Sequence, residues 1–196
     1  MLKTVNRKSF LKAYPDFPQS NNYRNTYTYP GIYNSYILYT DAVSTRGLCN
    51  NVATALTKLM KLLNYRQLSF LGDSTIPWLY RDHDYKPVKR GLDFLVQNKV
   101  SKTFAGALTV DVENLPGFAK HLFWLVRCNG VVFTPYFCDE GFNIIANVCK
   151  YGNIHFDTLN EQADLAFNKA IGQTGLVIST DNNCYTGKIP GRTIVV

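Results

Sequence analysis

An apolar stripe between residues 48 and 63 constrains the fold more than any other feature of this sequence. Its members recur at the spacing of one α-helical face, and polar residues fill the positions between them. Ser44 or Thr45 is placed to cap the start of the helix, and Asn64 to end it. A helix with one apolar face has to bury that face against a core. The stripe consists of Leu48, Val52, Ala55, Leu56, Leu59, Met60 and Leu63.

The second half of the chain alternates between helical and β-type patterns. It predicts a helix over 114–128, strands over 131–137, 142–149 and 154–156, a helix from a Thr158-x-x-Glu161 capping box to 171, and a strand over 176–179. We therefore predict an α+β fold. It comprises an N-terminal arm and amphipathic helix, then a helix, a three-stranded antiparallel meander, a helix and a final strand.

The first half is less regular outside the predicted helix. Apolar and polar residues alternate over 33–40 enough to predict a strand. Residues 92–96 form an apolar run, and periodicity does not decide whether this run is a strand or a helical turn. The charged, proline-containing segment 81–90 is predicted to be an exposed loop. We expect one compact domain over 1–196, with a possible soft boundary near residue 101 between an arm and helical part and an α+β part.

Composition limits the class of protein but does not indicate a reaction. The 196 residues are 46% hydrophobic, which excludes a mainly disordered chain. The net charge of +7 makes an acidic partner plausible. Clustered cations beside aromatic rings are what nucleic-acid recognition requires, although a solvated face is the commoner explanation. The candidate binding residues are Arg81, Lys86, Lys89, Arg90, Tyr85 and Trp78.

The turn Gly72-Asp73-Ser74 follows an apolar run and suggests a nucleotide-handling alternative. Nucleotidyltransferases place a Gly-Ser turn beside the triphosphate and hold Mg²⁺ with paired carboxylates. Ser74, Asp93 and Asp111 are the candidate catalytic residues, but Gly91 stands where an Asp-x-Asp pair would need its first carboxylate. An ordinary strand and turn is the favoured interpretation. Mg²⁺ is a cofactor only under this alternative, and otherwise none is predicted.

Cysteine and histidine patterns are also weak. Cys138, Cys149, His155 and Asp157 allow a Cys-His-Asp nucleophile set or a zinc site, yet their spacing matches no familiar motif. We favour core cysteines and a capping aspartate, and predict no metal site. Five widely spaced cysteines without a C-x-x-C pair favour a reducing cytoplasm. No signal peptide or membrane span is expected.

Three short motifs resemble a small uncharacterised module of tailed-bacteriophage proteins. They are Gly47-Leu48-Cys49-Asn50-Asn51-Val52, Gly72-Asp73-Ser74-Thr75-Ile76-Pro77 and Arg90-Gly91-Leu92-Asp93-Phe94-Leu95-Val96. The resemblance covers about residues 45–98 and carries no known activity. It implies a phage-encoded protein that acts in the bacterial cytoplasm.

The favoured hypothesis is therefore an accessory protein that binds a host protein or nucleic acid, for host takeover or against a defence system, rather than an enzyme. A nucleotide-handling enzyme and a structural or assembly protein are the alternatives, and the oligomeric state stays open.

Overall fold

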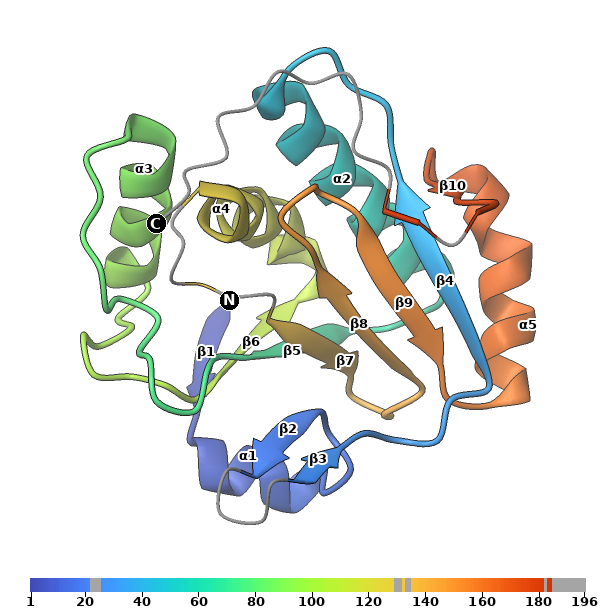
Figure 1. Ribbon diagram of the computed structural model, residues 1–196, viewed down its shortest axis with the longest axis horizontal. Helices are drawn as coiled ribbons and strands as arrows, with labels where there is room; N and C mark the ends of the chain where they lie inside the picture. Colours follow the sequence, from blue (N-terminus) through green and yellow to red (C-terminus); the bar gives the residue numbers. More distant parts are fainter. Residues whose placement is uncertain (22–25, 129–131, 133–134, 182, 185–196) are drawn as a thin grey trace.

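The computed structural model describes residues 1–21, 26–128, 132, 135–181 and 183–184. An eight-stranded antiparallel sheet forms its centre (Figure 1). The strands lie in the order β1 (Leu2–Val5), β6 (Ala107–Asp111), β5 (Gln67–Leu71), β7 (Tyr136–Asp139), β8 (Ile144–Val148), β9 (Ile154–Thr158), β4 (Asn34–Tyr39) and β10 (Val177–Ile178). Strands from before and after residue 101 are thus interleaved in one sheet.

Five α-helices and several short elements complete the described part of the chain. The helices are α1 (Arg7–Ala13), α2 (Thr45–Leu62), α3 (Lys86–Gln97), α4 (Leu115–Cys128) and α5 (Glu161–Ala170). The 3-10 turns η1 (Val112–Asn114) and η2 (Ile171–Gln173) flank two of them, and β2 (Gln19–Asn21) pairs with β3 (Thr26–Thr28) in a small second sheet. None of these helices is long and apolar enough to cross a membrane.

The predicted architecture is wrong. The sequence indicated a three-stranded meander with a separate final strand, whereas the described part of the chain is α+β with an eight-stranded antiparallel sheet and five α-helices. Strands β1, β5 and β6 come from distant parts of the chain and become strands by pairing with one another, which a local pattern does not show. Parts of the predicted strand over 131–137 lie outside the described residues, and β7 begins at Tyr136.

Two local predictions also need correction. Segment 81–90 is a loop only to Tyr85, because α3 begins at Lys86 with Pro87 in its first turn, where a helix tolerates proline. The apolar run 92–96 lies in this helix. The N-cap of α5 is Asn160 rather than Thr158, and its side chain accepts a hydrogen bond from the Ala163 amide at 2.8 Å.

The main core lies between the sheet and helices α2, α4 and α5 (Figure 1). The predicted stripe of α2 is buried there and packs on α4, so this helix occupies the range that the sequence indicated. Phe70 of β5 contacts Phe118 of α4, with ring centroids 4.9 Å apart. Phe156 of β9 stacks on Phe167 of α5 at 4.8 Å. Inward-facing strand residues thus meet one apolar face of each helix.

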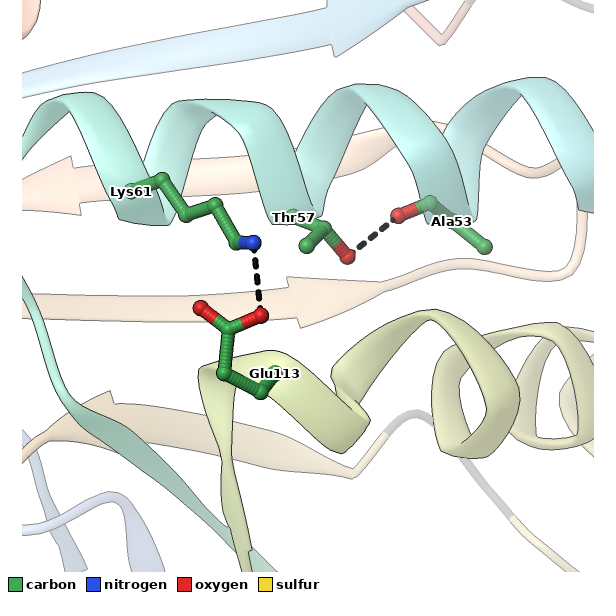
Figure 2. Close-up of polar contacts among 4 residues, drawn as sticks. All are labelled: Ala53, Thr57, Lys61 and Glu113. Atoms are coloured by element: carbon green, nitrogen blue, oxygen red, sulfur yellow. Dashed lines mark hydrogen bonds and ion pairs between the residues drawn. The ribbon is translucent and has the colours of Figure 1, made fainter.

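Polar contacts along α2 are satisfied locally (Figure 2). The buried Thr57 hydroxyl donates to the Ala53 carbonyl at 2.8 Å, within its own helix. Lys61 forms an ion pair with Glu113 of η1, 2.8 Å between Nζ and Oε2. Both side chains of this pair are largely exposed, so it contributes at most about 1 kcal/mol to stability.

A smaller apolar cluster lies on the opposite face of the sheet, at one end. Phe10 of α1 and Phe17 pack on residues of β5, β6, β7 and β8, including the buried Cys138. Helix α1 and the β2–β3 pair lie at this end of the sheet (Figure 1). On the same face, beyond this cluster, the strands carry polar side chains, among them the buried Ser69, Thr109 and Asn147.

Candidate metal centre

Two cysteines and a histidine come together at the end of β8 and the start of β9. The Sγ atoms of Cys149 and Cys184 are 4.0 Å apart, and Cys184 Sγ lies 3.3 Å from His155 Nε2. The ligand atoms of the three residues all lie within 4.8 Å of one another. Among the described residues, no other group of three or more Cys, His, Asp or Glu side chains converges in this way.

The tight turn between β8 and β9 places Cys149 and His155. The Cys149 amide donates to the Asn153 carbonyl at 3.0 Å, and the Gly152 amide donates to the Cys149 carbonyl at 2.9 Å. Gly152 has φ of 86°, and a Cβ there would lie 2.6 Å from Leu48 of α2, so the turn requires glycine. In β9, alternation buries Ile154 and Phe156 in the main core and turns His155 to the other face.

Cys184 arrives from the segment that follows β10. The Ser179 amide donates to the Ile37 carbonyl of β4 at 2.8 Å, and Ile37 lies directly opposite His155 in the β4–β9 pairing. The Ser179 hydroxyl lies 2.7 Å from a carboxylate oxygen of Asp181 and 3.1 Å from the Asn183 carbonyl, and either oxygen can accept its single proton. This local folding brings residue 184 back to the imidazole. Contact between the three ligands therefore depends on β10 joining the sheet edge.

Hydrogen bonding gives the three groups different proton affinities. Burial opposes ionisation of Cys149, but hydrogen bonds from His155 and from backbone amides of the turn outweigh it and lower the pKa of the thiol to about 7. The bond to Cys149 raises the pKa of His155 against the effect of burial, and the charge of Asp157 adds to the rise. Burial and the neighbouring Cys149 raise the pKa of Cys184 to about 11. Cys149 is thus the thiol most readily present as thiolate.

The sequence indicated Cys149 and His155 only in an alternative that we did not favour, and Cys184 was missed. Cys149 and His155 do meet, and Asp157 lies two residues from His155 on the same strand face, where it accepts a hydrogen bond from the Tyr29 hydroxyl at 2.6 Å. Cys138 is instead fully buried in the smaller apolar cluster. Cys184 carried no sequence signal, because it lies 29 residues beyond His155 and no motif spacing links the two.

The three nucleotidyltransferase candidates lie apart. Leu71 pairs with Ala107 and Gln67 with Asp111, so the Ser74 turn and Asp111 lie at opposite ends of the β5–β6 pair, about 13 Å apart along the strands. Asp111 instead forms an ion pair with the N-terminal amine at 2.7 Å. Asp93 lies on α3 and pairs with Lys89 at 3.2 Å. This arrangement offers no paired carboxylates beside the turn.

The binding candidates divide into exposed and buried residues. Arg81, Lys86, Lys89 and Arg90 are exposed on or just before α3, and Tyr85 is 47% exposed. Trp78 is only 2% exposed, and its indole N–H donates to the Gly106 carbonyl at 2.9 Å. Trp78 therefore belongs to the core, where its ring closes over Gly72.

No protein-family model, curated protein or solved structure matches this chain. The resemblance to a phage module stays a sequence-based prediction, and the function is argued from the site alone.

Proposed function

We propose that this protein binds a soft divalent cation of the zinc type through Cys149, His155 and Cys184. The spacing of the three donors carries the proposal. Zinc bonds of about 2.3 Å to sulfur and 2.0–2.1 Å to nitrogen, at tetrahedral angles, require about 3.8 Å between two sulfurs and about 3.6 Å between sulfur and nitrogen. The two sulfurs lie 4.0 Å apart, and Cys184 Sγ lies 3.3 Å from His155 Nε2. The third pair, Cys149 and His155, lies within 4.8 Å.

The donor types favour zinc over the other cations and over a purely covalent role. Thiolates and imidazole select Zn²⁺ and related soft ions, whereas Mg²⁺ and Ca²⁺ take oxygen ligands. A disulfide would require the sulfurs of Cys149 and Cys184 about 2 Å closer than they are. A Cys-His nucleophile pair would use Cys149 and His155 and leave the contact of Cys184 with the imidazole unexplained. A metal accounts for all three side chains.

Metal content and affinity test this proposal. The protein, purified under reducing conditions without chelators, is expected to bind one Zn²⁺ per chain by elemental analysis. In competition with a chromogenic chelator, Cys149→Ser, His155→Ala and Cys184→Ser should each weaken zinc binding by at least about 100-fold, since even changes outside the ligand shell cost about 10–100-fold.

Two control variants distinguish the loss of a metal ligand from a general disturbance of the fold. Cys128→Ser replaces a buried cysteine that is not one of the three ligands, and His83→Ala a half-buried loop histidine, so both should keep the wild-type affinity. A reduced wild-type protein that takes up no zinc would contradict the proposal. So would a Cys184→Ser variant with unchanged affinity.

We also propose, as a second function, nucleic-acid binding by the basic start of α3. Four exposed cations within ten residues and an exposed Tyr85 support it, and a phage-encoded accessory role is compatible with it. Fluorescence anisotropy with a labelled single strand should show about tenfold weaker binding for Lys86→Gln/Arg90→Gln at low salt. The double variant Lys58→Gln/Lys169→Gln removes the same charge elsewhere and should bind as wild type. Equal loss in both variants would show that binding follows the net charge of the protein rather than the start of α3, and it would contradict this proposal.

A further inference from the structure

We infer that the metal at this site keeps one coordination position for an exchangeable ligand, water at rest and a small anion in its place. This inference rests on the proposed zinc centre and concerns what the centre can bind. Tetrahedral zinc takes four ligands; structural sites supply all four from the protein, whereas sites with three protein donors leave the fourth to water or substrate.

Three side chains are available as metal ligands at this site. Within the described residues, no fourth Cys, His, Asp or Glu donor joins the cluster of Cys149, His155 and Cys184 within 4.8 Å. The remaining residues of the chain, 22–25, 129–131, 133–134, 182 and 185–196, include no residue of these four types. The usual side-chain ligands of this chain are therefore exhausted at three, and the fourth has to come from outside that set.

An unpaired hydrogen-bond acceptor lies beside the cluster. Asn147 of β8 is directly opposite His155 in the β8–β9 pairing and two residues before Cys149, so its side chain is on the same face of the sheet. It is only 8% exposed, and its Oδ1 has no hydrogen-bond partner among the residues that the structure describes. Buried polar atoms without a partner are rare and costly. A fourth ligand that carries a proton, as water does, would supply the missing donor.

Cobalt substitution tests the inference with a spectroscopic readout. The full-length protein loaded with one Co²⁺ should show the visible bands of a tetrahedral thiolate site. Sodium azide should then shift these bands saturably as it replaces water. In Asn147→Ala the bound water loses an acceptor while azide, which has no proton to donate, loses nothing. We therefore expect azide to bind about fivefold tighter to this variant than to wild type. Asn98→Ala, at the end of α3, should leave the azide affinity unchanged.

The outcomes distinguish this inference from the proposal beneath it. If neither Co²⁺ nor Zn²⁺ binds, the proposed zinc centre and the exchangeable position are both wrong. If Co²⁺ binds at one per chain but azide leaves the spectrum unchanged, the zinc centre stands and the exchangeable position is excluded. A stoichiometry of one Co²⁺ per two chains would show a ligand from a second copy and overturn the assignment to water. Equal azide affinity in wild type and Asn147→Ala would overturn the role of Asn147.

Discussion

At the scale of single residues, the buried Asp164 shows how a charged group is accommodated in this fold. It is 7% exposed and accepts hydrogen bonds from the Tyr36 hydroxyl at 2.7 Å and the Thr158 hydroxyl at 3.0 Å, and Asn168 adds a third at 3.1 Å. Burial opposes ionisation of Asp164, but these donors outweigh it and lower the pKa of the carboxyl below its usual value. The carboxylate therefore stabilises the junction of β4, β9 and α5.

This shift in pKa predicts how stability depends on acid. A carboxyl whose pKa is lower in the folded state stabilises the fold above its unfolded pKa of about 3.9, and that contribution is lost as the pH falls through the folded value. Asp164→Asn removes the titrating group, so we expect the variant to lose about 1 kcal/mol of stability at pH 7. Its free energy of unfolding should then fall less than that of wild type between pH 5 and pH 3.

Urea unfolding at several pH values measures both quantities. Asp16→Asn, at an exposed aspartate in the segment after α1, serves as the control and should follow the wild-type pH profile. The explanation fails if Asp164→Asn keeps the full acid sensitivity of the wild-type protein.

At the scale of elements, the errors of the sequence analysis have local causes. Pro87 was interpreted as a break, yet proline fits the first turn of a helix, and Val88, Leu92 and Leu95 extend the apolar stripe of α3 back to that turn. The capping pattern at Thr158 was assigned to the wrong residue, because Asn160 provides the cap and the Thr158 hydroxyl serves Asp164. In both cases the sequence allowed more than one start for the helix, and packing selected one of them.

At the scale of the whole molecule, the sheet and its covering helices share one aromatic centre. Phe70 is completely buried, and its ring centroid lies 4.9 Å from that of Phe118 in α4 and 4.8 Å from that of Phe137 in β7. The side chain thus joins the helical layer to the middle of the sheet. A cavity at this position would be surrounded by rigid elements that cannot easily close it.

We therefore predict that Phe70→Ala lowers the free energy of unfolding by about 3–5 kcal/mol. Val96→Ala, at a 56% exposed position on α3, should change it by less than about 0.5 kcal/mol. Chemical denaturation followed by tryptophan fluorescence measures both. A loss of under about 1 kcal/mol for Phe70→Ala would show that this contact is not central to the core.

The sequence by itself determined the elements whose pattern is local. The apolar stripe predicted α2, the segment after Asn114 predicted α4, and β-rich runs separated by turns indicated the strands that became β8 and β9. Periodicity shows which face of an element is apolar, but it does not show which strands pair. Tertiary structure alone interleaved the two halves in one sheet and, through the β4–β10 pairing, brought Cys184 to His155. The complete candidate site was beyond prediction, because its third ligand, Cys184, depends on that long-range pairing.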